Sequence, residues 1–403
     1  MAADARAHTG NTSVNDVASI FEVATNPLVA STIEGDTVPE NSGARPSVVV
    51  VGGGFAGITV AKALDDLADV TLVDPSDTFL HNLASWRALV DPAWLERIFF
   101  PYERLLANGR FLRDHAVAVD GHRVALASGL ELSPDYLILA TGSSYPFPAK
   151  TDETDAARAR KRFLRAHHDL RGARHALVVG AGPAGLELAG EIKTFYPEKQ
   201  VTLADLSDDI LPGPYDQELR EELRRQLDKL GVELVLGSPL RALPDTPAAT
   251  AGRVAVTTAA GEDIDADIWF RAFGVTPATG YVSGSLAAAR DEHGYLRVDG
   301  QLRVSGHEGV FAIGDISDAD RNMAGTARLQ AELLAANLRA ELTGDGGPVG
   351  YEKLPPVIAI PLGPEGGAGL LPGVDGVAGP DLIAEVKGRA MMVETFQDLF
   401  DAR

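Results

Sequence analysis

One stretch near the start of the chain decides the fold, and it reads Ser47-Val48-Val49-Val50-Val51-Gly52-Gly53-Gly54-Phe55-Ala56-Gly57. Four consecutive valines are typical of a strand that is buried on both faces of a parallel sheet. Gly52, Gly54 and Gly57 follow with the spacing G-x-G-x-x-G. In this motif the first glycine permits a tight turn, the second lets a pyrophosphate approach, and the third allows close helix packing. The stretch therefore predicts a strand, a phosphate-binding turn and the start of a helix.

An acidic residue completes this first unit. Asp74 ends a second apolar run, residues 70–74. It lies about 20 residues beyond the glycines, where dinucleotide-binding units carry a carboxylate for the ribose hydroxyls. We therefore expect an adenine dinucleotide here, rather than a glycine-rich turn without a ligand.

The same plan occurs a second time. Residues 176–179 are apolar, and the motif Gly180-Ala181-Gly182-Pro183-Ala184-Gly185 follows them. Asp205 ends the next apolar run. A carboxylate at this place pairs with the 2′-hydroxyl of NAD and repels the 2′-phosphate of NADP. The second unit therefore predicts NADH, with NADPH the poorer fit, although Asp205 also suits an ordinary turn at a strand end.

Two later segments resemble strands that deliver residues to a cofactor. Residues 310–315, Val-Phe-Ala-Ile-Gly-Asp, predict a buried strand before Asp315, and residues 137–142, Leu-Ile-Leu-Ala-Thr-Gly, predict a strand that ends in a turn. With these segments, His81-Asn82, Arg87-Ala88 and residues 191–199, the chain resembles the pyridine nucleotide-disulfide oxidoreductase family of flavoproteins. The resemblance is strongest to its apoptosis-inducing-factor-like branch, which includes the ferroptosis suppressor proteins and has type II NADH dehydrogenases as more distant relatives.

The resemblance implies an α/β fold with two Rossmann-like domains, as in glutathione reductase, and a small C-terminal α+β interface domain. The resemblance implies FAD and a nicotinamide dinucleotide as cofactors, and the preference for NADH comes from Asp205 alone. We expect FAD contacts from Gly52, Gly53, Gly54, Phe55, Ala56, Gly57, Asp74, Arg87, Ala116, Thr141, Gly142, Gly314, Asp315 and Ala324. We expect NADH contacts from Gly180, Gly182, Pro183, Ala184, Gly185 and Asp205, and a cofactor contact from Gly274. Glu187 and His81 are the candidate catalytic residues, close to the nicotinamide and the flavin.

Three of these residues also have plainer explanations. Arg87 is a single charge in an apolar segment, and either a phosphate or a surface carboxylate would satisfy it. Glu187 would stabilise the N-terminal end of a helix through the helix dipole. His81 would handle protons or serve only as a structural histidine.

The composition restricts the chemistry. The chain has no cysteine, so a dithiol relay beside the flavin is excluded. Electrons must leave the reduced flavin directly for a quinone, dioxygen, a carrier protein or an oxidisable organic substrate. The sequence offers no cluster of metal ligands, and we expect no metal site.

The formal net charge of −21 argues against nucleic acid and against anionic lipid as partners. Residues 158–175 are an exception, because ten of these positions are Arg, Lys or His. This segment predicts a helix with a solvated basic face, or a docking surface for an acidic carrier such as a ferredoxin. No apolar run is long enough to span a membrane, so we expect a cytoplasmic protein, with peripheral membrane contact left open.

These landmarks predict the domains. Residues 1–45 form a partly disordered arm, residues 46–147 and 268–345 the FAD domain, residues 148–267 the NAD domain and residues 346–403 the interface domain. Apolar residues near the end, Met391, Met392, Phe396 and Phe400, predict a domain contact or a homodimer contact.

Three functions fit this sequence. The first is an NADH:quinone-type oxidoreductase that reduces a small acceptor. The second is a reductase for a ferredoxin-type carrier. The third is a flavoprotein that acts on a specialised peptide or natural product recognised by the N-terminal arm.

Overall fold

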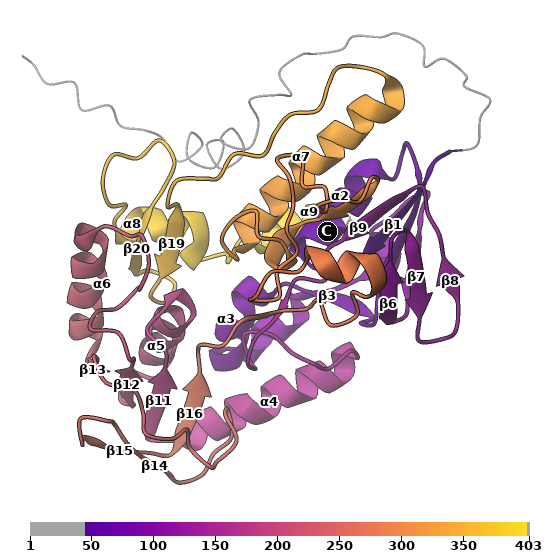
Figure 1. The fold of residues 1–403 in the computed structure, drawn as a ribbon. Coiled ribbons are helices and arrows are strands. Elements are labelled where there is room, and N and C mark those ends of the chain that lie inside the picture. Colours follow the sequence, from indigo (N-terminus) through magenta and orange to yellow (C-terminus); the bar gives the residue numbers. More distant parts are fainter. Residues whose placement is uncertain (1–44, 401–403) are drawn as a thin grey trace, which may run out of the picture.

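The computed structural model describes residues 45–400, so the predicted arm lies outside the described residues. Two parallel sheets form the centres of two domains that lie side by side (Figure 1). The architecture is the predicted α/β fold with two dinucleotide-binding units. No helix in residues 45–400 has the length and apolar character needed to cross a membrane.

The first sheet is built around the valine run. β1 (Ser47–Val51) pairs in parallel with β2 (Asp69–Asp74) and with β9 (Tyr136–Leu139). β5 (Arg110–Arg113) and β18 (Val310–Ala312) extend the sheet at its two edges, also in parallel. The connections between parallel neighbours bring the carboxyl ends of these strands to one edge of the sheet.

Both faces of this sheet are covered, which explains the unbroken valine run. Val48 and Val50 pack against α2 (Phe55–Leu64) and α7 (Ala324–Thr343), which also contact each other. Val49 and Val51 face the opposite way and pack with a small antiparallel sheet. That sheet consists of β6 (Ala116–Asp120), β7 (Arg123–Leu126) and β8 (Glu131–Leu132).

The second sheet repeats the plan. Its strand order is β13 (Val232–Val235), β12 (Gln200–Ala204), β11 (His175–Val179) and β16 (Ile268–Arg271), all parallel. The predicted boundary at residue 267 falls just before β16, so the second sheet extends four residues past it. The reason is that the short apolar run Ile268-Trp269-Phe270 pairs with β11 and is buried.

Helices and a hairpin complete this domain. α5 (Pro183–Phe195) follows the second glycine motif, and α6 (Gln217–Leu230) precedes β13. α4 (Ala156–Gly172) joins the two domains, and its first turn is capped by the Asp155 side chain. The hairpin of β14 (Val254–Thr257) and β15 (Asp263–Ala266) packs on β11.

A short insertion between β2 and β5 connects the two cores. It contains the hairpin of β3 (Thr78–Leu80) and β4 (Phe99–Pro101), and the helix α3 (Ser85–Val90). Ala88 of α3 packs in the first core, whereas Trp86 and Leu89 pack in the second core. α3 therefore belongs to both domains.

The tail spans both domains as well. The hairpin of β19 (Ile358–Pro361) and β20 (Gly367–Leu370) packs on α5 and α6. α8 (Pro380–Ile383), a π-helix (Ala384–Gly388) and α9 (Val393–Leu399) follow. Phe396 and Phe400 then pack into the first core, so these aromatic residues make a domain contact within one chain.

We expect Phe400→Ala to lower the free energy of unfolding by about 3–5 kcal/mol, because a large buried ring leaves a cavity. The Phe400 ring is fully buried and stacks on Phe79 and Phe100, with ring centroids 5.8 and 5.3 Å away. Urea denaturation measures the change. Leu130→Ala, at a position 46% exposed, is the control and should change little. Equal effects of the two substitutions would show that α9 does not stabilise the fold.

Candidate functional site

The predicted site residues gather at the carboxyl ends of three neighbouring strands. The first glycine motif follows β1, Thr141 follows β9 and Asp315 follows β18. These strands are adjacent in the sheet. Gly314 lies between two helices, because a Cβ atom at this residue would be 3.4 Å from the Cβ atoms of Ala56 in α2 and Ala327 in α7. The glycine turn, the aspartate and the start of α7 at Ala324 therefore converge.

The first glycine motif has the shape that a pyrophosphate needs. Gly52 has φ +104°, and a Cβ atom there would be 2.5 Å from the carbonyl oxygen of Ala140. A Cβ atom on Gly57 would be 1.8 Å from the carbonyl oxygen of Gly52. Gly54 differs, since nothing lies within 4 Å of the place its Cβ atom would take. The open side of the turn at Gly54 and the amides that start α2 form a cradle that fits a pyrophosphate.

The second glycine motif has the same geometry. Gly180 has φ +112° and lies against the carbonyl oxygen of Ala272. A Cβ atom on Gly185 would be 1.8 Å from the carbonyl oxygen of Gly180, and Gly182 is open in the way that Gly54 is. Pro183 begins α5, where proline suits the first helical position. Ala184 is the next residue of this helix. Because Gly182 is open and the helix starts beside it, this cradle also fits a pyrophosphate.

Each cradle is braced by the predicted carboxylate. Asp74 accepts hydrogen bonds from the amide nitrogens of Gly53 and Ser76, at 2.7 and 2.8 Å. Asp205 accepts hydrogen bonds from Ala181 and Ser207, at 2.6 and 2.8 Å. Burial raises the pKa of Asp74, and the two amide hydrogen bonds oppose that shift. Each carboxylate oxygen keeps a second lone pair that can accept a hydrogen bond from a ribose hydroxyl.

The first cradle is also closed by a tyrosine that the sequence analysis missed. The Tyr102 hydroxyl donates to the carbonyl oxygen of Gly53 at 2.7 Å. A side chain on Gly53 would collide with this ring. Burial, followed by the Asp74 charge, raises the pKa of Tyr102 well above its ordinary value. Tyr102 therefore acts as a neutral donor that fixes the turn.

Asp315 is held by two residues that the sequence analysis did not identify. The Ser143 hydroxyl donates to its carboxylate at 2.6 Å, and the Lys150 ammonium lies 3.2 Å from the same oxygen. Lys150 also donates to the Ser143 hydroxyl at 2.8 Å. The lysine offsets the negative charge of Asp315 and fixes its orientation.

The remaining predicted cofactor residues lie around these cradles. Phe55 begins α2, Ala116 begins β6, and the Thr141 hydroxyl donates to the carbonyl oxygen of Ala278 at 2.8 Å. Gly142 and Gly274 have φ +64° and +93°, and both follow strands at the carboxyl edge of a sheet. The structure therefore places them on the side of the sheets where the cradles open.

The two candidate charged residues have partners in other parts of the chain. Glu187 of α5 forms an ion pair with Lys387 of the tail at 2.7 Å. Arg87 of α3 pairs with Glu191, with Nε–Oε2 and Nη2–Oε1 distances of 2.6 and 2.7 Å. Both members of the second pair are buried. Within the chain, the partner of Arg87 is therefore a buried carboxylate, whereas the sequence suggested a phosphate or a surface carboxylate.

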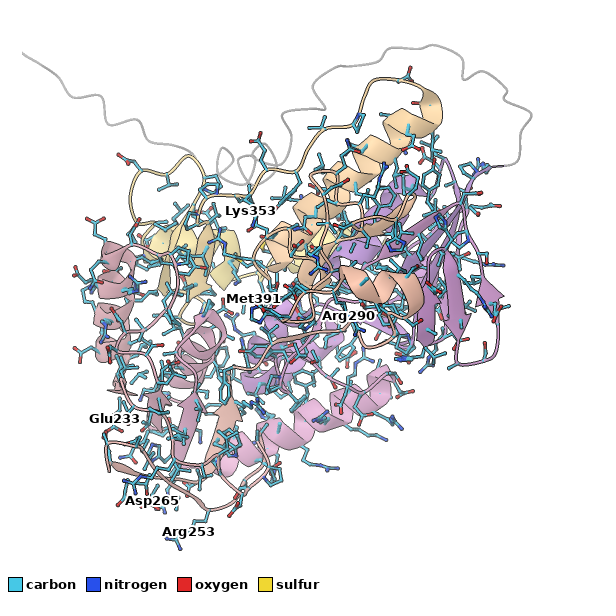
Figure 2. The ribbon with its side chains drawn as sticks, viewed as in Figure 1. Glu233, Arg253, Asp265, Arg290, Lys353 and Met391 are labelled. Carbon is cyan, nitrogen blue, oxygen red and sulfur yellow. The ribbon has the colours of Figure 1, made fainter. Side chains whose placement is uncertain are left out.

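His81 lies in an aromatic cluster at the junction of the domains and the tail. Its ring is fully buried beside Phe55 and Phe396, with centroid distances of 5.8 and 4.7 Å. Nε2 donates to the carbonyl oxygen of Met391 at 2.7 Å, and Nδ1 has no partner among the described residues. Figure 2 labels Met391. Burial lowers the pKa of His81 to about 4. The imidazole is therefore neutral near pH 7.

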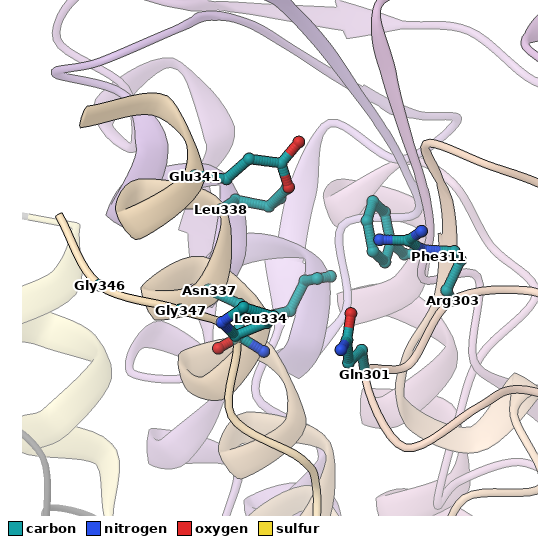
Figure 3. A pocket seen from close by; sticks show the side chains of 10 residues that line it. Gln301, Arg303, Phe311, Leu334, Asn337, Leu338, Glu341, Gly346 and Gly347 are labelled. Atoms are coloured by element: carbon teal, nitrogen blue, oxygen red, sulfur yellow. The ribbon is translucent and has the colours of Figure 1, made fainter. Parts of the chain in front are cut away.

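A separate cavity of about 320 Å³ lies at the other end of α7 (Figure 3). Leu334, Asn337 and Glu341 of α7 face Arg303 and Phe311 across it. None of the predicted site residues lines this cavity. Within residues 45–400, no group of His, Asp and Glu side chains is arranged to bind a metal ion.

The sequence pattern of the pyridine nucleotide-disulphide oxidoreductase family matches residues 46–331. The chain belongs to this family. It is an FAD-dependent NAD(P)H oxidoreductase, and because it has no cysteine it lacks the redox disulfide that the family name describes.

Individual relatives agree with this membership. Human ferroptosis suppressor protein 1 is 35% identical over 318 residues, which cover 75% of this chain and 83% of that protein. Apoptosis-inducing factor homolog A of Dictyostelium discoideum is 27% identical over 344 residues, 80% of this chain and 84% of that protein. The structure of NDH2 from Plasmodium falciparum in complex with NADH superimposes with a TM-score of 0.69 at 13% identity, covering 88% of this chain and 95% of that one. This superposition supports the fold.

We expect Gly54→Val to fold but to bind FAD roughly tenfold more weakly, because the side chain would project into the open cradle. Titration of the apoprotein with FAD measures the dissociation constant. Gly172→Val is the control, since this position also has open space around it and lies at the end of α4. An unchanged dissociation constant for FAD in Gly54→Val would show that the pyrophosphate does not bind at Gly54.

We expect His81 to make the protein less stable in acid. Its pKa of about 4 in the folded state lies below the ordinary value of 6.5, so stability is full above pH 6.5 and falls as the pH approaches 4. The loss between about pH 7.5 and pH 5 should be about 2 kcal/mol, and His81→Gln should remove it.

Urea denaturation at the two pH values tests this expectation. The matched control is His168→Gln, because the His168 side chain is 87% exposed. The same pH dependence with and without His81 would contradict the assignment.

Proposed function

We propose that this protein oxidises NADH through bound FAD and reduces a quinone-like small molecule. The overall reaction is NADH + H⁺ + quinone → NAD⁺ + quinol. One hydrogen leaves C4 of the nicotinamide as a hydride, and the other comes from solvent as a proton. One observation supports this proposal above all. Two matching pyrophosphate cradles, at Gly54 and Gly182, occur in one chain that has no cysteine.

The residues of the first domain suit FAD. The cradle at Gly54 would hold its pyrophosphate, Asp74 its ribose, and Asp315, with Lys150 and Ser143 behind it, the hydroxyls of its ribityl chain. When bound, FAD supplies the chemistry of accepting a hydride and passing on electrons. The protein supplies orientation, exclusion of water and charge near the reacting atoms.

The second domain suits NADH. Gly182 would receive the pyrophosphate, and Asp205 would accept hydrogen bonds from the 2′-hydroxyl of the adenosine ribose. The 2′-phosphate of NADPH would meet the Asp205 charge. The NDH2 structure that superimposes on this chain is a complex with NADH, which supports the same choice.

Glu187 and Lys387 would form the polar part of the hydride-transfer site. Their side chains are 10% and 12% exposed, so little water reaches the ion pair. Lys387 also donates to the carbonyl oxygen of Ala359 at 3.2 Å. This anchoring would keep the charge of Glu187 compensated close to the nicotinamide. His81, neutral and already bonded to Met391, suits a structural role better than proton transfer.

Anaerobic mixing with NADH tests the proposal. The yellow protein should be bleached by NADH and should regain its colour when menadione is added. In two parallel reactions, a ferredoxin replaces menadione or no acceptor is added, and the return of colour is compared. If NADH fails to bleach the flavin, the proposal is wrong, and if only ferredoxin restores the colour, the acceptor is a carrier protein.

One observation favours the carrier protein as a second candidate acceptor. Lys161, Arg165 and Arg171 are exposed on α4, and no ion pair is formed by these three side chains within residues 45–400. Leu164, 48% exposed, lies among them. In a chain of net charge −21, this basic face would attract an acidic protein. The third candidate, a specialised substrate bound by the N-terminal arm, depends on residues outside the described part of the chain.

We expect Asp205→Asn to raise the ratio of kcat/KM for NADPH to kcat/KM for NADH by about tenfold, the equivalent of about 1.4 kcal/mol. The amide keeps the size of the side chain and removes its charge. Steady-state kinetics with the two nucleotides measure the ratio. Asp265→Asn, an exposed carboxylate of the same domain, is the control. If the ratio of the two kcat/KM values is unchanged in Asp205→Asn, the 2′ position of the adenosine ribose does not lie beside this carboxylate.

A further inference from the structure

Two carboxylates one turn apart on α5 join three parts of the chain. Glu187 pairs with Lys387 of the tail, and Glu191 pairs with Arg87 of α3. α3 packs into both domain cores, and α5 belongs to the nucleotide domain. These two ion pairs therefore lie at the place where the first domain, the second domain and the tail meet.

Arg87 connects the two ion pairs through the backbone of the tail. Its Nη2 atom donates to Glu191 at 2.7 Å and also to the carbonyl oxygen of Gly388 at 2.9 Å. Gly388 is the residue that follows Lys387. One guanidinium group therefore holds both the carboxylate of α5 and the backbone of the tail next to the lysine that reaches Glu187.

The backbone at this point is tightly constrained. Lys387 and Gly388 end a π-helix, a rare element that is frequently found at functional sites. A Cβ atom on Gly388 would be 2.6 Å from the carbonyl oxygen of Pro364. The π-helix therefore lies close to the loop between β19 and β20. A shift of the π-helix would move the Lys387 side chain.

The surroundings of Arg87 make its geometry specific. The side chains of Arg87 and Glu191 are only 3% and 1% exposed, and the rings of Trp94 and Phe195 lie 5.2 and 5.6 Å from the guanidinium carbon. Burial raises the pKa of Glu191, and the Arg87 charge opposes that shift. A buried pair of this kind is costly to desolvate, so its presence is weak evidence of a contribution to overall stability, and removing one partner leaves an uncompensated buried charge.

We propose that Arg87 is a positioning residue. With Glu191 and the Gly388 carbonyl, it fixes the two domains and the tail so that Lys387 meets Glu187 at the hydride-transfer site. This inference rests on the proposed function. It assigns Arg87 a role through protein contacts, in place of the direct FAD contact that the family resemblance implied.

Arg87→Lys and Glu191→Gln test the role. Each substitution keeps a polar group but loses the two-bond arrangement of a guanidinium with a carboxylate. We expect each to slow flavin bleaching at saturating NADH about 10- to 100-fold, since a small misplacement of the reacting groups has effects of this size. The FAD content should stay at the wild-type level. The double variant should be no slower than the slower single variant, because both substitutions break the same contact.

The exposed pair of Arg389 and Glu365 in the same tail is the matched control. Their side chains are 54% and 67% exposed, with a distance of 2.6 Å. Arg389→Lys and Glu365→Gln should leave the bleaching rate unchanged. The variant Arg87→Met/Glu191→Met, which leaves no unpaired buried charge, keeps the test usable if a single variant does not fold, and it should also be slow.

Hydrogen exchange of the amides in residues 384–392 gives a readout that does not depend on turnover. Protection should fall in Arg87→Lys and in Glu191→Gln, but not in the control variants. Loss of FAD in Arg87→Lys alone would mean that Arg87 binds FAD and would overturn the inference, as would wild-type bleaching and protection in both variants. If NADH does not bleach the wild-type protein, the proposed function fails, and hydrogen exchange still decides the role of Arg87.

Discussion

The closeness of a helix to the strand that precedes it is the constraint on which both dinucleotide units depend. At Gly57 and at Gly185, a single Cβ atom would be 1.8 Å from the carbonyl oxygen of the first glycine of the motif. Any side chain would push the helix away from the strand. The amide groups at the start of the helix would then no longer line the open space beside Gly54 and Gly182.

The sequence predicted the local geometry of the two glycine turns and of the carboxylates beside them. The glycine turns, Asp74 and Asp205 follow strands and turns that are close in the chain, so their spacing determines where they lie. The helix predicted over 158–175 is α4, which spans Ala156–Gly172 and starts at the Asp155 cap, whereas His175 already belongs to β11. The edge of the second sheet depends on a short apolar run, β16. The predicted NAD domain ended at residue 267 and therefore missed the four residues of this strand.

Long-range contacts could not be predicted in this way. Lys387 meets Glu187 across 200 positions of the chain, and no pattern in the tail marks it. Lys150 and Tyr102 likewise approach Asp315 and Gly53 only because the sheet brings distant segments together. Arg87 gave a partial signal, since a charge in an apolar segment requires a partner, but the identity of Glu191 depends on the burial of α5 beneath the tail hairpin.

The tail has a consequence for how substrates would enter. The hairpin of the tail packs on α5 and α6, and its last helix packs in the other core. Rotation of one domain against the other would therefore break the contacts of an aromatic cluster and expose buried charges to solvent. Hinge closure is a common response to ligands, but this molecule is braced against it. The relative position of the two domains would then change little when the nucleotide binds, and structures determined with and without NADH would superimpose.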